Sequence, residues 1–531
     1  GNKMKKRLLV LLLSVCLTAQ SLPVSAAQIT AEPQQENLLE ETTETADEGE
    51  AAKKDTEESD TAGDPESAEN ESEEEEPEVP EEEPELPEES EEEDGTTDPE
   101  TPKTEAETDL EEESGMIAEA FVSLEGVLQN GDLEPVEAEC PEEPETEIQM
   151  ARASVKIETY LYRQLKKRAY SIDVEEYGLG IDDISKALAV TVNSNPDLYY
   201  VDTSRFNYYY YQDTGAVTSI MLDYANTDDK AFDRAVNEAL AEVTPQMTDL
   251  EKIVVLHDYL VLHTEYDFEG YTSGNLSEES FSAYGVFVKK KAVCSGYMLA
   301  YHYLLKKCGI TDYYVTSTSM NHAWNVVKLG KNYYHVDTTW DDMVPDVQGV
   351  TSHQFLLVSD QELEEPETEG TPKHYGWSVY NAGYTKKISA VGKDCQYESA
   401  FWRGILSPVI ANNGAFIYRK GSDMMERSAL PDGEEHVLFS LPMEGELADN
   451  GDSLVGIASV YNNRLYYVTD KKVASCTLDG RDQRVHYSQD QIIWGFFLAD
   501  GTAKVTYYNG SEQVTTPITL KNMDQIDLTG A

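Results

Sequence analysis

Three residues of the types that act together in thiol enzymes, Cys294, His322 and Asp337, occur in that order within 44 residues. A cysteine can attack an amide carbonyl, a histidine can take up and return the proton, and a carboxylate can orient the imidazole. Taken singly, each residue is more typical of a structural role: a small buried side chain, a satisfied histidine and a turn former. Their order and their expected secondary structure favour a shared catalytic role.

Cys294 comes directly before a segment with helical periodicity. Tyr297, Tyr301 and Leu304 recur at spacings of three and four, and Gly309 is typical of a helix end. At a helix N-terminus, the unpaired backbone N–H groups and the positive end of the dipole favour a thiolate over a thiol. The same N–H groups could hold a developing oxyanion. The pattern therefore predicts a nucleophile at Cys294.

His322 and Asp337 belong to a predicted pair of antiparallel strands. Residues 322–329 alternate in polarity, the Gly330-Lys331 pair is typical of a turn, and a second strand runs up to Asp337. If the turn holds an even number of residues, Asp337 lies opposite Trp324 and diagonal to His322 on one face. A slip of one residue would place Asp337 on the other face, so the predicted contact depends on the register.

The motifs around these residues resemble those of a known family. The sequences CSGY at 294–297, HAWN at 322–325 and VDTTWD at 336–341 are similar to motifs of the transglutaminase-like superfamily, particularly its exported bacterial members. The similarity is clearest over residues 250–342 and extends to residue 378.

The resemblance implies an α+β fold with a papain-like core and a Cys-His-Asp triad at Cys294, His322 and Asp337. The superfamily includes peptide hydrolases, enzymes that transfer acyl groups to amines, and inactive binding modules. The resemblance therefore indicates which chemistry the site performs, but it leaves the substrate open.

Other polar residues do not form a competing pattern. His302 is expected on the surface of the helix after Cys294, and His335 is expected to pack. The acidic cluster Asp341, Asp342 and Asp346 could bind a cation weakly, although it lacks the spacing of a calcium loop. Six histidines lack partners at the spacing of zinc ligands: His257, His263, His302, His335, His353 and His374. We therefore expect no cofactor and no metal ion.

The N-terminal residues are typical of a secretory signal peptide. Basic residues at 5–7 precede an apolar run at 8–17, and small residues at 24–26 are suited to cleavage, so residues 1–27 are predicted to be removed. Lipidation at Cys16 is a weaker alternative, because valine is a poor residue before the lipidated cysteine. With no later apolar segment long enough to span a membrane, we expect a secreted protein, free or associated with the cell wall.

Export also affects how the cysteines are interpreted. Of the six cysteines, five remain after signal-peptide removal, and an odd number leaves at least one thiol unpaired. The catalytic hypothesis requires that this thiol is Cys294. Cys395 and Cys476 could pair, but the sequence leaves the pairing open.

A long acidic segment separates the signal peptide from the rest of the chain. Residues 31–150 contain 49 Asp and Glu against 3 Lys, so most of the net charge of −62 lies there. With few aromatic residues, residues 28–150 are predicted to form a disordered tether. Residues 116–128 are an exception, since their apolar residues recur at helical spacing and could dock on the folded part. The strongly acidic charge argues against nucleic-acid binding.

The remaining chain has globular composition and is predicted to form two parts. Residues 151–378 mix helix and strand patterns and form the catalytic domain, with its core at 250–342. Residues 395–531 are predicted to be all-β, with a repeat of 49 and then 41 residues marked by Tyr418, Tyr467 and Tyr508. Three copies are too few to close a propeller, which favours a meander or a partial propeller-like sheet as an accessory binding domain.

Together these features predict a secreted thiol enzyme that acts on amide bonds of proteins or peptides, with cell-wall peptides among the candidate substrates. Hydrolysis is favoured over cross-linking, because water is the default acceptor and no amine-binding feature is visible. The alternative is a catalytically silent surface adhesin or scaffold with a transglutaminase-like fold. The sequence leaves the oligomeric state open.

Overall fold

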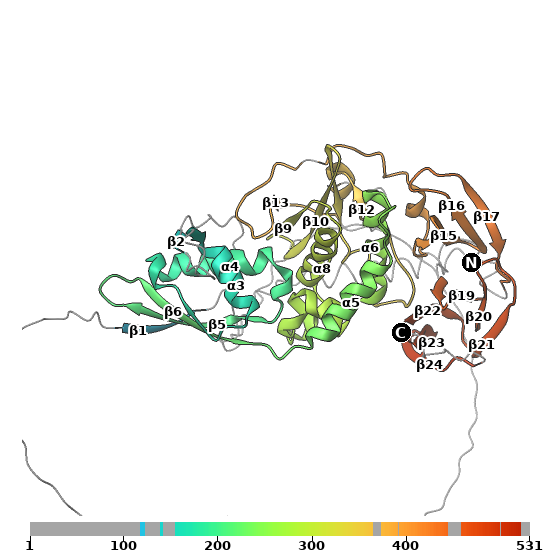
Figure 1. Ribbon diagram of the computed structural model, residues 1–531. Coiled ribbons are helices and arrows are strands. Elements are labelled where there is room, and N and C mark those ends of the chain that lie inside the picture. Colours follow the sequence, from blue (N-terminus) through green and yellow to red (C-terminus); the bar gives the residue numbers. More distant parts are fainter. Residues whose placement is uncertain are drawn as a thin grey trace, which may run out of the picture. The chain divides into compact units, whose positions relative to one another are not determined.

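The computed structural model describes residues 117–122, 139–141, 154–364, 373–390, 392–443, 458–499 and 501–521 (Figure 1). All of them belong to one compact unit. The predicted signal peptide, Cys16 and most of the predicted tether lie outside the described residues. No helix among the described residues is long and apolar enough to cross a membrane.

The first part of the fold is a four-stranded antiparallel sheet with the order β1-β5-β6-β4, packed against two helices. The apolar sides of the helices and Tyr208 of the sheet form one core. The elements are β1 (Ile117–Val122), β4 (Ser171–Asp173), β5 (Val201–Tyr211), β6 (Val217–Tyr224), α3 (Ile157–Lys166) and α4 (Ile181–Ser194), with the pair β2 (Glu139–Pro141) and β3 (Ser154–Lys156) and the short helices η1 (Glu175–Tyr177) and η2 (Pro196–Leu198) beside them.

Residues 117–122, for which helical spacing was noted, form strand β1 and not a helix. β1 pairs with β5 from Ile117 opposite Tyr211 to Val122 opposite Phe206. The apolar side chains of Ile117 and Phe121 are exposed, so backbone hydrogen bonds to the sheet edge hold this segment. Docking through backbone pairing explains why the spacing of its apolar residues did not predict its structure.

The central part packs helices α5 (Asp229–Ala241), α6 (Asp249–His263) and α8 (Cys294–Lys307) beside a second antiparallel sheet (Figure 1). Its order is β12-β11-β10-β9-β13. The strands are β9 (Asp312–Ser317), β10 (His322–Leu329), β11 (Asn332–Val336), β12 (Leu356–Val358) and β13 (Ser378–Tyr380). Shorter elements connect these: β7 (Glu265–Tyr266), α7 (Phe268–Ser273), η3 (Glu278–Phe281), η4 (Gly285–Lys289), β8 (Lys291–Ala292) and α9 (Asp360–Glu364).

Local features stabilise two helices of the central part, α6 and α8. Thr248 and Glu251 form a reciprocal capping box at the start of α6, which satisfies backbone N–H groups that the helix leaves unpaired. In α8, Tyr297, Tyr301 and Leu304 are fully buried, as the helical spacing predicted. This buried face sets the direction in which the N-terminus of α8 points.

The C-terminal part consists of three antiparallel sheets, each a meander of consecutive strands. Tyr418, Tyr467 and Tyr508 lie on the second strand of the three sheets, so the repeat in the sequence corresponds to a repeat of sheets. The strands are β14 (Ile410–Asn412), β15 (Ala415–Lys420), β16 (Asp423–Arg427) and β17 (Glu435–Ser440); β18 (Ala458–Tyr461), β19 (Arg464–Val468), β20 (Lys472–Thr477) and β21 (Arg484–Ser488); and β22 (Ile493–Ala499), β23 (Thr502–Asn509) and β24 (Glu512–Ile518). The predicted fold class, a mixed α and β core followed by an all-β region, is confirmed.

The first meander shares a hydrophobic core with the central helices. Trp402, in the short helix η5 (Phe401–Gly404), and Tyr418 and Met425, on β15 and β16, belong to the same buried cluster as the apolar residues of α6 and α8. The limits proposed for the two domains, 151–378 and 395–531, stay predictions. Their cores are nevertheless continuous at this point.

Candidate active site

Cys294 is the first residue of α8 and is partly buried. The close approach of neighbouring backbone fixes this helix start. A Cβ atom on Gly296 would lie 2.8 Å from the carbonyl oxygen of Ser280 and 2.9 Å from Cβ of Ala292. Only glycine fits at this position without a shift of the backbone, so Gly296 helps to place the thiol at the positive end of α8.

The hairpin of β10 and β11 has the register that the catalytic hypothesis requires. Leu329 pairs with Asn332 across a two-residue turn, and Asn325 pairs with Val336. Asp337, one residue further on, therefore lies opposite Trp324, as the prediction for an even-numbered turn states. The Nε2 atom of His322 is 2.6 Å from Oδ2 of Asp337.

Asp337 is fully buried, and its second oxygen is held by the backbone. The N–H groups of Thr339 and Trp340 both donate to Oδ1 of Asp337, at 3.1 Å. Burial alone raises the pKa of Asp337, but the charge of His322 and the hydrogen bonds from the histidines outweigh burial and hold the pKa well below its usual range. Asp337 is therefore an ionised and firmly oriented carboxylate.

His322 is correspondingly protonated near neutral pH. Burial lowers its pKa, but the charge and hydrogen bond of Asp337 and a side-chain hydrogen bond with Cys294 outweigh burial and raise the pKa to about 10. Because Nε2 faces Asp337, Nδ1 is the nitrogen left to exchange a proton with the thiol. An imidazolium beside the thiol at a helix N-terminus stabilises the thiolate.

A second histidine, His374, contacts the same carboxylate oxygen. Its Nε2 lies 2.8 Å from Oδ2 of Asp337, and its ring centroid lies 3.9 Å from that of Trp340. Burial lowers the pKa of His374 to about 4 against the pull of Asp337, so the ring is neutral and donates its Nε2–H. No motif in the sequence indicated a role for His374. It lies 37 residues beyond Asp337, and no motif spacing connects the two.

Aromatic side chains surround His322. The rings of Trp324 and Trp340 stack on His322 with centroid distances of 5.3 and 5.1 Å. Burial, with a contribution from the charge of Cys294, raises the pKa of Tyr271 and of Tyr384. Both tyrosines therefore carry neutral hydroxyl groups near neutral pH.

Two groups of side chains bring three potential metal ligands within 4.8 Å of one another: His322, Asp337 and His374, and His257, Asp258 and His353. Within each group the nitrogen–oxygen contacts are hydrogen-bond distances, 2.6 and 2.8 Å in the first and 2.8 and 3.0 Å in the second. Zinc bonds of about 2.0–2.1 Å would separate tetrahedral ligands by about 3.3 Å. Both groups therefore have the geometry of hydrogen-bonded side chains.

Other residues singled out in the sequence have hydrogen-bond partners outside the group of Cys294, His322 and Asp337. His302 is buried, and its Nδ1 lies 2.8 Å from Oδ1 of Asp312, so its predicted surface position was wrong. His335 packs as predicted, accepting from Nε1 of Trp324 at 2.9 Å. The acidic cluster does not form a group of metal ligands among the described residues, since each carboxylate has its own partner: Asp341 with His257, Asp342 with Tyr297 and Asp346 with Gln348.

Four cysteines in the described residues are free: Cys294, Cys308, Cys395 and Cys476. The pairing considered for Cys395 and Cys476 is therefore wrong. Cys476 is buried on β20, where Leu465 opposes it, whereas Cys395 is exposed. Cys294 differs from the other three in its position at the N-terminus of a helix and beside a histidine.

Comparison with known proteins agrees with the resemblance noted in the motifs. Residues 237–338 match the family model of the transglutaminase-like superfamily, and this range includes Cys294, His322 and Asp337. The chain therefore contains a transglutaminase-like domain. Members of this superfamily are usually cysteine enzymes. A comparison with curated proteins found no match.

Among solved structures, a TGase is 19% identical to this chain, with 23% of this chain and 41% of the TGase covered and a TM-score of 0.20. The NAT3 arylamine N-acetyltransferase from Bacillus cereus, which has a Cys-His-Glu catalytic triad, is 10% identical, with 54% of this chain and 92% of that chain covered and a TM-score of 0.18. The chain thus spans about two fifths of the length of that TGase. These TM-scores are too low to support a statement about activity.

Proposed function

We propose that the protein is a thiol enzyme that cleaves or transfers at amide bonds through Cys294, His322 and Asp337. The observation that supports this most is the buried ion pair of His322 and Asp337 beside a thiol at the start of α8. A structural hairpin has no need for a buried imidazolium aimed at a cysteine. Burying such a charge costs free energy unless it is paired.

The proposed reaction has two stages. The Cys294 thiolate attacks the amide carbonyl carbon, and backbone N–H groups at the start of α8 stabilise the resulting oxyanion. The imidazolium of His322 gives its proton to the leaving nitrogen, the C–N bond breaks, and an acyl thioester forms on Cys294. Water or an amine then attacks the thioester carbon while His322 takes its proton and Asp337 keeps the ring oriented. The C–S bond breaks, the acid or the new amide leaves, and the Cys294 thiolate and the His322 imidazolium are restored.

We propose hydrolysis over transfer to an amine, since water is the default acceptor. The proposed substrate is a protein or peptide met outside the cell, with cell-wall peptides as candidates. This location is supported by the signal-peptide pattern at residues 1–27. We propose that the all-β C-terminal region binds the cell surface or the cell wall near the substrate.

The test begins with the thiol itself. We expect iodoacetamide to alkylate Cys294 in the folded, full-length protein at pH values where an ordinary thiol, with a pKa near 8.5, is unreactive. The exposed thiol of Cys395, which lies outside the group of Cys294, His322 and Asp337, serves as the internal control. If Cys294 follows the same pH profile as Cys395, the catalytic proposal fails and the scaffold interpretation replaces it.

A second experiment separates the two reaction outcomes. Glutamine peptides, proteins and wall peptides are incubated with the enzyme, with and without a primary amine. Release of free acid in both conditions supports hydrolysis, whereas incorporation of the amine supports acyl transfer. Cys294→Ala should show neither product.

A further inference from the structure

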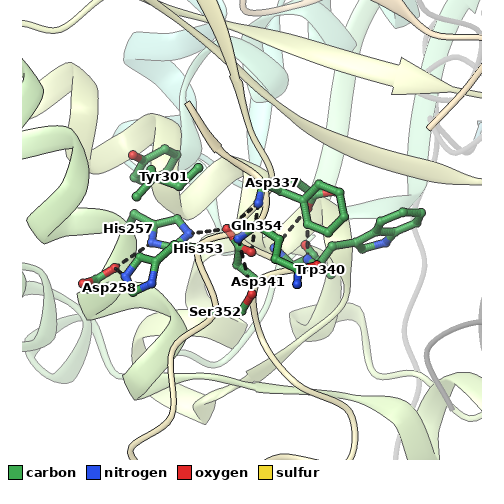
Figure 2. A network of polar contacts seen from close by, with 12 residues as sticks. His257, Asp258, Tyr301, Asp337, Trp340, Asp341, Ser352, His353 and Gln354 are labelled. Carbon is green, nitrogen blue, oxygen red and sulfur yellow. Dashed lines mark hydrogen bonds and ion pairs between the residues drawn. The ribbon is translucent and has the colours of Figure 1, made fainter. Parts of the chain in front are cut away.

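A second buried group of ionisable side chains is connected to Asp337 of the candidate active site through polar contacts (Figure 2). His257 and Asp258 come from α6, Asp341 from the loop that follows Asp337, and His353 from the segment before β12. Each of the four is at most 2% exposed. Ionisable groups so fully removed from water are stable only where their charges and hydrogen bonds are matched. Their geometry therefore indicates which of them carry protons.

The ring of His257 has a carboxylate at each nitrogen. Its Nδ1 lies 2.8 Å from Oδ1 of Asp258, and its Nε2 lies 3.0 Å from Oδ2 of Asp341 (Figure 2). A neutral imidazole has only one N–H to donate, whereas an imidazolium has two. Two ionised acceptors on opposite sides of the ring are satisfied only by the charged form. His257 therefore links the two carboxylates as a cation.

The electrostatic surroundings agree with this assignment. Burial lowers the pKa of His257, but the hydrogen bonds and charges of Asp258 and Asp341 outweigh burial and raise the pKa to about 9. Burial raises the pKa of Asp258, but His353 and His257 together lower it to about 2.

Asp341 connects this cation to the backbone of Asp337. The N–H of Asp341 donates to the carbonyl oxygen of Asp337 at 3.2 Å. The Asp341 carboxylate accepts the N–H of Phe355 at 3.1 and 3.2 Å, and the carbonyl oxygen of Phe355 accepts the N–H of Asp337 at 3.1 Å. These bonds hold the peptide groups on both sides of Asp337. A displacement of Asp341 must therefore displace Asp337.

Two other polar side chains, His353 and Tyr301, lie near His257, and each has hydrogen-bond partners other than Asp341. His353, with its ring centroid 5.7 Å from that of His257, lies 3.0 Å from Oδ1 of Asp258 and 3.3 Å from the carbonyl oxygen of Ile405. Tyr301 of α8 donates its hydroxyl to the carbonyl oxygen of Ile253 at 2.8 Å, and burial keeps that hydroxyl neutral by raising its pKa well above the usual value. Neither group hydrogen-bonds Asp341.

We propose that His257 is a positioning residue of the candidate active site, whose imidazolium joins α6 to Asp341 and thereby holds Asp337 in place to orient His322. The inference rests on the proposed thiol chemistry of Cys294. His257 is 84 residues from Asp341 in the sequence. It lies on α6, a helix that carries no member of the triad.

The test measures how fast iodoacetamide alkylates Cys294 as a function of pH, with the modified residue located by peptide mass spectrometry. We expect His257→Gln, in the full-length and folded protein, to slow alkylation near neutral pH by about 10- to 100-fold, the effect of misplacing a catalytic group by an ångström or less. The acid limb of its profile should move toward that of an ordinary thiol. A role in stability alone would lower the melting temperature and leave this profile unchanged.

His486→Gln is the matched control. His486 is also a buried histidine with two hydrogen-bond partners, Oγ of Ser475 and the carbonyl oxygen of Lys521, but it lies on β21 in the second meander. This variant should keep the wild-type profile of Cys294. If His257→Gln also keeps it while the wild-type thiol is activated, His257 has no positioning role. A wild-type thiol that is not activated contradicts the proposed function instead.

A measurement on the wild-type protein covers the case in which His257→Gln does not fold. Histidine labelled with nitrogen-15 distinguishes charged from neutral rings by NMR. At pH 8 at least two imidazolium rings should remain, those of His257 and His322, since their pKa values are raised to about 9 and about 10. A neutral His257 ring at pH 8 would overturn the inference, whereas a neutral His322 ring would contradict the proposed function instead.

Discussion

Asp337 carries its charge in a fully buried position, where it receives hydrogen bonds from two histidines and two backbone N–H groups. This makes the pair of His322 and Asp337 a source of pH-dependent stability. The pKa of His322 in the folded protein is raised from 6.5 to about 10. Its contribution to the free energy of unfolding is therefore complete below about pH 6.5 and is lost as the pH rises toward 10. Because the pKa of Asp337 is lowered, its contribution is present above the usual value of 3.8 and is lost as the pH falls.

Asp337→Asn should remove both the orienting charge and the alkaline part of this pH dependence. Without the carboxylate, burial lowers the pKa of His322, so the ring becomes neutral near pH 7 and the thiolate loses its cationic partner. By analogy with the orienting carboxylate of serine enzymes, kcat should fall on the order of 10²- to 10⁴-fold. The measurements are the Cys294 alkylation profile and the free energy of unfolding between about pH 6.5 and 10.

Asp360→Asn is the control for this prediction, since Asp360 also pairs with a buried histidine, Nε2 of His335, at 2.9 Å, but contacts no member of the triad in the described residues. It should leave the Cys294 profile unchanged. An Asp337→Asn protein with wild-type reactivity at pH 6 would show that the carboxylate does not control His322.

The triad could be predicted from the sequence because its geometry is local. Cys294 begins a helix with a clear apolar period, and a two-residue turn fixes the register that brings Asp337 near His322. His374 and His257 could not be predicted in this way. Their contacts with Asp337 and Asp341 depend on how long loops and α6 pack, and a histidine on a buried helix face has the same local pattern whether or not it carries a charge.

At the level of elements, the start of α8 is the feature that the sequence specifies most tightly. It is enclosed by η3 and β8, and the glycine at its third position allows both to approach. The sequence pattern predicted the helix and placed Cys294 at or near its N-terminus. It could not show why position 296 must be glycine, because the segments that crowd it come from residues 280–292.

Gly296→Ala should therefore both destabilise the protein and reduce the reactivity of Cys294. The added Cβ would meet the carbonyl oxygen of Ser280 at 2.8 Å, and relieving such overpacking typically costs about 1–3 kcal/mol. Because the helix start would have to move, the thiol would also leave its place beside His322. Thermal unfolding and the Cys294 alkylation rate measure the two effects.

Gly404→Ala is a matched substitution in η5, where an added Cβ has no atom within 4 Å. It should change the free energy of unfolding by no more than about 0.5 kcal/mol. Equal effects of the two substitutions would mean that the packing around Gly296 does not position the thiol.

At the scale of the whole molecule, the composition of the sequence separated an α+β part from an all-β part, and the structure shows both. It did not indicate that the two share a core. The apolar residues of β15 and β16 look like those of any half-buried strand, and their partners on α6 and α8 are more than 100 residues away. Hydrogen bonds also connect the all-β part to α6. The N–H of Val409 donates to Oδ2 of Asp258 at 2.7 Å, and the N–H of Leu430 donates to Oε1 of Glu251 at 3.2 Å.

Deleting residues 395–531 should consequently impair the transglutaminase-like domain and not only the binding of a surface. The deletion removes fully buried Trp402 and Tyr418 from the core of α6 and α8, and truncating one such large side chain already costs on the order of 3–5 kcal/mol. It also removes a backbone partner of Asp258, next to His257. We expect a large fall in melting temperature and, in whatever remains folded, slower alkylation of Cys294. A truncated protein with the wild-type melting temperature and alkylation profile would show instead that residues 151–378 fold and work as an independent domain.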